Sequence, residues 1–142
     1  MQPDFRISSL IPAGFAIQSV MRAEETIVVK ALAESRTAAC PLCGFLSRRI
    51  HSRYVRQVAD LPCSGRKVRL QITTRRFVCD APHCRRRVFA ERFGDGVLPE
   101  RSRRTARLEC IVHHLGLALG GRPAASFAKR LMLPVSNDTV SG

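Results

Sequence analysis

The 142-residue sequence predicts a small α+β fold in which a β-rich N-terminal part precedes an α-helical part. Two observations carry this prediction. Short cysteine pairs stand among β-branched and alternating segments, and after Gly96 the apolar residues recur at the helical period of 3.6. A chain of this length forms one domain or two small ones, and neither small domain would bury much apolar surface.

The first 14 residues contain Pro3, Pro12 and Gly14 and are predicted to be a poorly ordered start. A β domain is expected over 15–96. Its first two strands would span 16–23 and 26–32, joined by a Glu-Glu turn, because the second segment contains a β-branched run.

The strongest strand signal comes later. Val68, Leu70 and Ile72 alternate with polar residues, which predicts a strand that buries one face and exposes a cationic one. The segment 60–65 is interpreted as the turn that precedes this strand, and 88–90 as a short return strand.

Two cysteine turns flank these strands: Cys40-Pro41-Leu42-Cys43-Gly44 and Cys79-Asp80-Ala81-Pro82-His83-Cys84. Four thiolates in two short turns match the needs of a tetrahedral zinc ion, and Gly44 can adopt the positive φ that points backbone N–H groups at the sulfurs. We therefore predict a zinc ribbon, with Zn²⁺ held by Cys40, Cys43, Cys79 and Cys84. Disulfides are the main alternative, and His83 could replace Cys84.

The remaining cysteines, Cys63 and Cys110, are interpreted as small apolar fillers. His51 is expected on a basic surface, and His113 and His114 at a packing edge of a helix. No oriented third group is recognisable that would make a Cys–His pair a nucleophile, so no catalytic residue is predicted.

A helical segment is expected over 97–142, starting with a helix from Arg101 to Leu119 that Gly120-Gly121 ends. The first turns of this helix are basic, which opposes the helix macrodipole unless a phosphate lies nearby. A second short helix would begin near Pro123. Its inner face would consist of Ala124, Phe127, Ala128 and Leu131.

A third helix is expected near Asn137, for which Ser136 is a good N-cap. Helix, short turn and capped helix outline a helix-turn-helix. The sequence stops at Gly142, so the recognition helix of this motif is expected to be truncated.

The net charge of +13 arises from 24 Lys and Arg against 11 Asp and Glu. Between Cys40 and Cys110, 17 basic and six acidic residues leave +11 of that excess. A basic patch tied to a folded module is typical of nucleic-acid binding. The alternative is that a biased genome composition has enriched arginine on solvent-exposed surfaces.

No signal peptide and no uncharged apolar run of 18 residues is present, so we expect a soluble cytoplasmic protein without membrane contact, nucleoid-associated when bound to DNA. A reducing compartment keeps thiols free to bind metal.

Several segments in order resemble the N-terminal part of bacterial insertion-sequence transposases of the ISL-three family. They are C-P-L-C-G, H-S-R-Y-V-R-Q-V-A-D-L-P-C-S-G-R-K-V, R-R-F-V-C-D-A-P-H-C-R-R-R-V-F-A-E-R and, later, A-L-A-L-G-G-R-P-A-A and L-P-V-S-N-D-T. The resemblance covers roughly residues 17–140. It implies that the four cysteines of the two turns bind zinc and that the zinc and helix-turn-helix parts bind double-stranded DNA, at the terminal repeats of the mobile element.

Transposases of this kind carry an RNase H-like catalytic domain whose acidic residues hold two metal ions. Nothing follows Gly142 here, so the chain is expected to be a truncated transposase that does not cut DNA. A homo-oligomer or a full-length transposase are possible partners. The residues predicted to contact DNA are Arg66, Lys67, Arg69, Arg75, Arg76, Arg85, Arg86, Arg87, Arg122, Ser136 and Asn137.

Two other functions remain open from the sequence. The first is an RNA-binding or ribosome-associated zinc ribbon, in which Tyr54, Phe77 and Phe89 would stack on bases. The second is a structural or protein-interaction ribbon whose charge is incidental.

Overall fold

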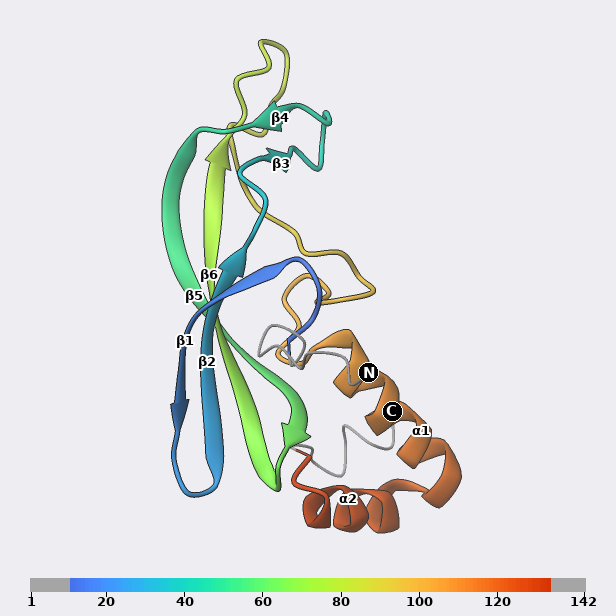
Figure 1. Cartoon of the computed structure of the whole chain (residues 1–142). Coiled ribbons are helices and arrows are strands. Elements are labelled where there is room, and N and C mark those ends of the chain that lie inside the picture. The colour runs from blue at the N-terminus through green and yellow to red at the C-terminus, as the bar shows by residue number, and fades with distance from the viewer. Residues whose placement is uncertain (1–10, 134–142) are drawn as a thin grey trace, which may run out of the picture.

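A computed structural model of the chain describes residues 11–133. In this part the fold consists of a five-stranded sheet, a two-stranded sheet and two helices (Figure 1). The strands are β1 (Phe15–Arg22), β2 (Thr26–Ala33), β3 (Ala38–Ala39), β4 (Leu46–Ser47), β5 (Ile50–Cys63), β6 (Arg66–Val78) and β7 (Val88–Ala90), and the helices are α1 (Ala106–Leu119) and α2 (Gly121–Arg130).

The predicted N-terminal hairpin is present. β1 and β2 pair antiparallel, and the turn between them is closed by a hydrogen bond of 2.8 Å from Ala23 N–H to the carbonyl of Thr26. The β-branched run that begins at Ile27 extends the second strand, as expected for side chains that fit a pleated and half-buried surface.

β5 and β6 form a hairpin much longer than the sequence predicted. β5 continues through Cys63, so the interpretation of 60–65 as a turn was wrong except at its end. The actual turn is Ser64-Gly65, with φ values of 52° and 70°. Two consecutive residues with positive φ match a two-residue hairpin turn, whose twist continues that of the flanking strands.

β6 lies at the centre of the sheet, whose order is β1-β2-β6-β5. β2 runs parallel to the first half of β6, from Thr26 opposite Lys67 to Leu32 opposite Thr73. β7 pairs antiparallel with the last residues of β6, at Arg76 to Val78. The parallel pairing was not predicted, because residue alternation reports which face a strand buries but not which strand lies beside it.

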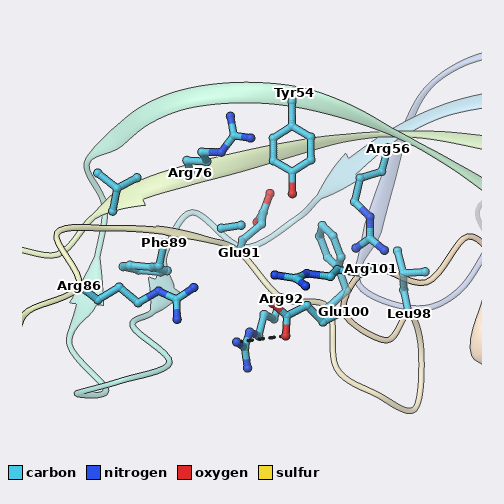
Figure 2. A pocket seen from close by; sticks show the side chains of 13 residues that line it. Tyr54, Arg56, Arg76, Arg86, Phe89, Glu91, Arg92, Leu98, Glu100 and Arg101 are labelled. Carbon is cyan, nitrogen blue, oxygen red and sulfur yellow. Dashed lines mark ion pairs between the residues drawn. The ribbon is translucent and has the colours of Figure 1, made fainter.

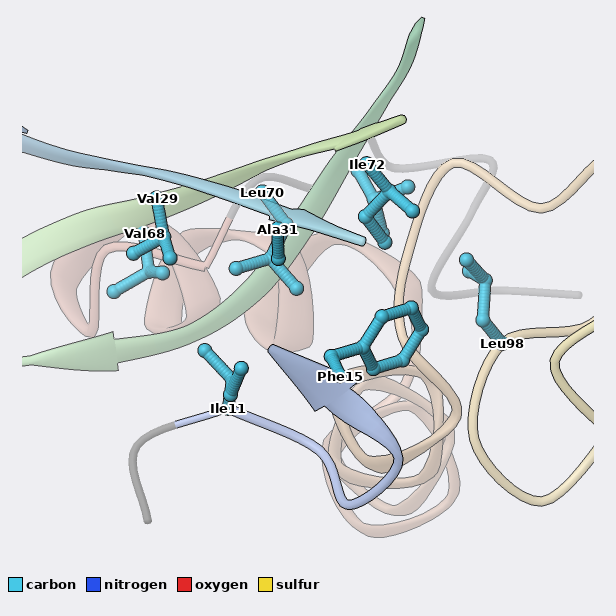
Figure 3. Packing of buried hydrophobic residues seen from close by; sticks show 9 residues of the cluster. Ile11, Phe15, Val29, Ala31, Val68, Leu70, Ile72 and Leu98 are labelled. Atoms are coloured by element: carbon cyan, nitrogen blue, oxygen red, sulfur yellow. The ribbon is translucent and has the colours of Figure 1, made fainter. Parts of the chain in front are cut away.

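The main core lies on one face of this sheet (Figure 3). The predicted inward residues Val68, Leu70 and Ile72 are all buried, and the exposed fractions of Leu70 and Ile72 are 1%. They pack with Ile11, Phe15, Val29, Ala31, Val58 and Leu98. The core therefore includes residues on both sides of the segment predicted as a β domain.

α1 begins at Ala106, five residues later than predicted, because Thr105 is its N-cap. The Thr105 hydroxyl accepts a hydrogen bond from the backbone N–H of Leu108, which satisfies one of the open donors of the first turn. Arg101, Arg103 and Arg104 consequently precede the helix and do not oppose its dipole from within.

A buried carboxylate lies at the start of α1. Asp60 of β5 has an exposed fraction of 1%, accepts a hydrogen bond of 2.7 Å from the Thr105 hydroxyl and binds Arg107 through both carboxylate oxygens. This negative charge at a helix N-terminus compensates the macrodipole. In this structure the carboxylate of Asp60 offsets the positive charge at the start of the helix.

We expect the substitution Asp60→Asn to lower the free energy of unfolding by about 1.5–3 kcal/mol, the contribution of a hydrogen bond to a charged group. Asparagine keeps the shape of the side chain but removes the charge that Arg107 and the helix dipole require. Chemical denaturation monitored by circular dichroism measures the loss. Asp95→Asn, at an exposed loop position, is the matched control and should leave stability unchanged.

α2 follows α1 after the single residue Gly120, whose φ is 78°. Ala124 and Ala128 are buried against Leu108 and Val112 of α1, as the predicted inner face requires. Phe127 and Leu131 were predicted on the same face, but their exposed fractions are 45% and 46%. That part of the prediction was wrong, because α2 crosses α1 through its alanines only.

The predicted third helix, including Ser136 and Asn137, lies outside the described residues. Within the described part, neither helix has the length and apolar character that crossing a membrane requires.

Candidate zinc centre and nucleic-acid interface

The four predicted cysteine ligands converge at one end of β6. The Sγ atoms of Cys40, Cys43, Cys79 and Cys84 all lie within 4.8 Å of one another. The Cys43–Cys79 and Cys40–Cys84 Sγ separations are 3.5 and 3.8 Å. Four sulfurs at about 2.3 Å from a tetrahedral Zn²⁺ stand about 3.8 Å apart, so the cluster has the dimensions of a zinc site.

The same distances exclude the disulfide alternative. A disulfide requires an S–S bond of about 2.05 Å. All six cysteines of the chain are free thiols, and His83 is exposed and does not join the cluster. Cys84, rather than His83, is therefore the fourth ligand.

Two secondary-structure units bring these ligands together. The first cysteine turn connects β3 to β4, and it is closed by a hydrogen bond of 2.9 Å from Cys40 N–H to the carbonyl of Phe45. The second turn follows β6 directly, with Cys79 N–H bonded to the carbonyl of Arg87. Figure 1 shows β3, β4 and the second turn together at the end of β6 that is remote from the helices.

The first turn also has the predicted backbone conformation. Gly44 has a φ of 81° and donates a hydrogen bond of 2.8 Å to the Cys40 carbonyl. Burial opposes ionisation of the Cys40 thiol, but hydrogen bonds from the backbone N–H groups of Cys43 and Leu42 and from the neighbouring thiols lower its pKa to about 7. The turn therefore stabilises a thiolate, the form that binds metal.

Cys79 is in the opposite situation. Burial, together with the sulfurs of Cys43, Cys84 and Cys40, raises the pKa of the Cys79 thiol to about 12 even though the Ala81 N–H bonds to it. A coordinated dication deprotonates such a thiol outright. Metal uptake by this site is thus coupled to proton release.

An aromatic pair packs against the zinc centre. Phe77 of β6 and Phe89 of β7 stack with ring centroids 6.0 Å apart and pack with Cys40 and Cys79. Their exposed fractions are 0% and 2%, so neither ring can stack on a nucleic-acid base. The sequence-based suggestion that these two phenylalanines bind RNA was therefore wrong.

The cysteines and histidines outside the cluster differ in their surroundings. Cys63 is half-buried at the edge of the main core, which fits the interpretation as a small filler. Cys110 is exposed on α1 beside His114, with Sγ 3.5 Å from Nδ1, so it fills no core space. His51 is on the surface, as predicted, and His113 is exposed as well.

Comparison with known proteins agrees with this geometry. Residues 36–84 match a family described as the zinc-finger of transposase IS204/IS1001/IS1096/IS1165. This segment is similar to a transposase zinc ribbon. It includes all four cysteines of the cluster, which bind Zn²⁺. No curated protein and no solved structure matches the chain.

The match to the transposase zinc ribbon covers about a third of the chain. It ends at Cys84, so the helices α1 and α2 lie outside it. The predicted helix-turn-helix remains a prediction that rests on the helix pattern of the sequence and on the resemblance.

Two of the predicted DNA-contacting residues lie on the sheet face opposite the main core. Lys67 and Arg69 are exposed there. Strand register places Lys30 and Arg53 on the same face, since Lys30 lies opposite Gln71 and Arg53 opposite Arg75. We call Lys30, Arg53, Lys67 and Arg69 the cationic sheet face. Its strand positions contain no acidic residue, because Asp60 points to the other side.

Sequence reasoning missed Lys30 and Arg53. Neither is part of a basic run that includes Lys67 or Arg69, and only the pairing of strands brings the four together. Exposed and half-buried residues alternate from His51 to Gln57 in the structure, but the sequence HSRYVRQ does not alternate polar with apolar residues, so no local signal marked Arg53.

Arg75 has a different role from the one predicted. Its side chain is 9% exposed and binds Glu91 through two hydrogen bonds, Nε to Oε1 at 3.1 Å and Nη2 to Oε2 at 2.8 Å. Nη2 also donates to the backbone carbonyl of Ser35. A guanidinium that is buried and paired with a carboxylate in this way is not available to a phosphate, so Arg75 does not belong to the exposed cationic surface.

The other predicted contacts are at the surface. Arg85, Arg86 and Arg87 are exposed between the second cysteine turn and β7, and Arg122 is exposed on α2. Arg66 is half-buried, with its Nε bonded to the Glu24 carbonyl at 3.2 Å. Arg76 is exposed, and its guanidinium carbon lies 4.2 Å from the centre of the Tyr54 ring.

Proposed function

We propose that the chain binds double-stranded DNA through the zinc ribbon and the cationic sheet face, at the terminal repeats of an insertion element. The observation that supports this most is a transposase zinc ribbon that carries exposed arginines directly beside its metal site. Phosphate contacts by Lys and Arg supply most of the affinity of such proteins for DNA.

The positive charge extends along the whole of β6. Lys67 and Arg69 lie near its start, and Arg85 to Arg87 follow the cysteine turn at its end. Thirteen residues of strand span about 43 Å at about 3.3 Å per residue. One turn of B-DNA is about 34 Å long. A duplex lying along the strand can therefore meet cations at both ends.

Zinc has a structural role in this proposal. Four cysteine ligands complete a tetrahedral shell and leave no position for substrate or water, which is typical of structural sites rather than catalytic ones. The metal would fix the two cysteine turns, and through them the arginines from Arg85 to Arg87, relative to the sheet.

We expect Arg69→Gln to weaken binding to all duplex sequences alike. Each lost phosphate contact should also lower the slope of log K against log salt by about 0.9, because fewer counterions are released. The measurement is fluorescence anisotropy with a terminal-repeat duplex and a scrambled duplex over a range of salt concentrations.

Arg22→Gln is the matched control. Arg22 is an exposed strand residue that pairs with Ile27, so it lies on the sheet face opposite to Arg69, and its loss removes the same charge. If Arg22→Gln and Arg69→Gln lower the affinity for DNA equally, the affinity depends on the net charge of the protein and not on the cationic sheet face. Tighter binding to RNA hairpins than to either duplex would favour an RNA-binding protein instead.

The helices supply the second part of the proposed DNA-binding unit. In this proposal α1 and α2 belong to a helix-turn-helix, and Arg122 contacts the DNA backbone. Association with a second copy, or with a longer transposase chain, would place two such units on the paired ends of the element. A terminal repeat preferred over the scrambled duplex in the same titration supports this assignment.

A further inference from the structure

The sheet face that carries the main core also forms one wall of a cleft beside β7. The cleft has a volume of about 490 Å³ and is bounded by β5, β6, β7 and the loop that follows β7. This volume lies in the range of about 300–1,000 Å³ that is typical of small-molecule sites. We call this feature the arginine cleft. Its charged and aromatic lining includes Tyr54, Arg56, Arg76, Arg86, Arg92 and Arg101.

The arginine cleft has a surplus of positive charge. Its two carboxylates are already engaged, Glu91 by the buried Arg75 and Glu100 by Arg92 at 3.2 Å. In the part of the chain that the structure describes, no carboxylate lies within ion-pair distance of Arg86 or Arg101. Figure 2 shows these two arginines entering the cleft from different sides.

The backbone also holds Arg101 in a costly conformation. Its φ is 62°, in the left-handed region that residues with a Cβ rarely adopt. Strain of this kind persists where the surrounding structure imposes it, and it is found preferentially at functional sites. The neighbouring loop is fixed by Arg56, which donates hydrogen bonds to the carbonyls of Pro99 and Ser102 at 3.3 and 2.7 Å.

An aromatic ring complements the cations. Tyr54 points from β5 into the cleft (Figure 2), and the guanidinium of Arg76 stacks on its ring. Arginines that bind phosphate, next to an aromatic side chain that stacks on a base, are the combination by which proteins hold single-stranded nucleic acid. A base inside a duplex is paired and stacked and cannot enter such a recess, whereas an unpaired base can.

From these observations we infer that the arginine cleft binds an unpaired nucleotide of a DNA strand. Arg86 and Arg101 hold its phosphate, and Tyr54 stacks on its base. The inference extends the proposed function, since it assumes that DNA is the ligand of this chain. It adds a site for unpaired DNA that is separate from the cationic sheet face, so the protein would prefer DNA whose end is frayed or overhanging to a blunt duplex.

Tyr54 is the only tyrosine and the chain contains no tryptophan, so the intrinsic fluorescence of the protein reports on the cleft alone. We expect a short oligothymidylate to quench this fluorescence in a saturable manner. In the variant Arg86→Gln/Arg101→Gly the dissociation constant should rise about tenfold or more, the scale of a lost charge-assisted hydrogen bond to phosphate. Glycine at 101 relieves the left-handed backbone, so the melting temperature should not fall.

The variant Arg36→Gln/Arg103→Gln loses the same two charges at exposed positions outside the cleft and should keep the wild-type dissociation constant. The inference is overturned if oligothymidylate does not quench wild-type Tyr54, or if both double variants lose affinity equally. It is also overturned if inorganic phosphate quenches as strongly at the same concentration, since the base would then add nothing.

This test can be separated from that of the proposed function. Blunt-duplex binding depends on the cationic sheet face and is measured through Arg69→Gln, which should leave Tyr54 quenching by oligothymidylate unchanged. A protein that binds blunt duplex but shows no quenching retains the proposed function and lacks the cleft site. A protein that shows quenching but does not bind blunt duplex has the cleft site and lacks the proposed duplex-binding function.

Discussion

The substitution Cys84→Ser should abolish zinc binding and unfold the ribbon. Apparent binding energies of structural zinc sites are about 10–16 kcal/mol, comparable to the entire net stability of a domain of about 5–15 kcal/mol. Apart from the metal, the second cysteine turn is held by backbone hydrogen bonds of Cys79 and Cys84 and by an exposed ion pair of Asp80 with Arg49 at 3.3 Å, which contributes about 1 kcal/mol or less. Metal analysis of the purified protein, with circular dichroism before and after chelation, measures both effects.

Cysteines and a histidine outside the cluster serve as controls for this substitution. Cys63→Ser and Cys110→Ser make the same chemical change at thiols outside the cluster, and both variants should retain one zinc per chain. His83→Ala should also retain it, because His83 is exposed and does not belong to the cluster. If Cys84→Ser retains zinc and loses it only when combined with His83→Ala, then the histidine is a ligand and the assigned ligand set is incorrect.

The sequence was sufficient to predict the zinc centre because its signal is local. Ligand type, the spacing within each turn and the need for positive φ at Gly44 are all contained in short segments, and the predicted four sulfurs meet in space. The face of β6 that is buried was predictable for a similar reason. Alternation along a strand reflects burial residue by residue.

The arrangement of the strands was not predictable in the same way. β2 pairs in parallel with the first half of β6, and β7 pairs with the end of β6 on the same edge. Both pairings join segments that are far apart in the chain. A single sequence carries no record of such pairings. The arginine cleft was missed for this reason, because Arg56, Arg86 and Arg101 come together only when the strands are assembled.

Asp60 illustrates how a buried charge misleads sequence interpretation. An aspartate followed by Leu-Pro is a reasonable signal for a turn, yet Asp60 lies inside β5 with its side chain fully buried. The strand tolerates it because Thr105 and Arg107 of a distant segment satisfy its oxygens. Thr105 and Arg107, which allow Asp60 to lie in a strand instead of a turn, are 45 or more residues away in the sequence.

Arg75→Gln should lower the free energy of unfolding by about 3–5 kcal/mol without a direct effect on DNA binding. Removing this guanidinium leaves Glu91 charged and unpaired with a side chain that is only 4% exposed, and breaking one partner of a buried pair has a cost of this size. The pair also links β6 to the end of β7, since Glu91 Oε1 accepts the backbone N–H of Arg75 at 2.9 Å. Denaturant unfolding of the zinc-loaded protein measures the effect.

A double variant isolates the cause. Replacing both partners by apolar residues, as in Arg75→Met/Glu91→Leu, removes the unpaired charge and should recover much of the lost stability, giving a coupling energy in a double-mutant cycle. Arg76→Gln, at the exposed neighbouring position, should leave stability nearly unchanged. At a temperature at which the Arg75 variants remain folded, their duplex affinity should equal that of the wild type. A loss of duplex affinity there, with an unchanged unfolding curve, would restore Arg75 to the DNA interface and contradict the role that its burial assigns to it.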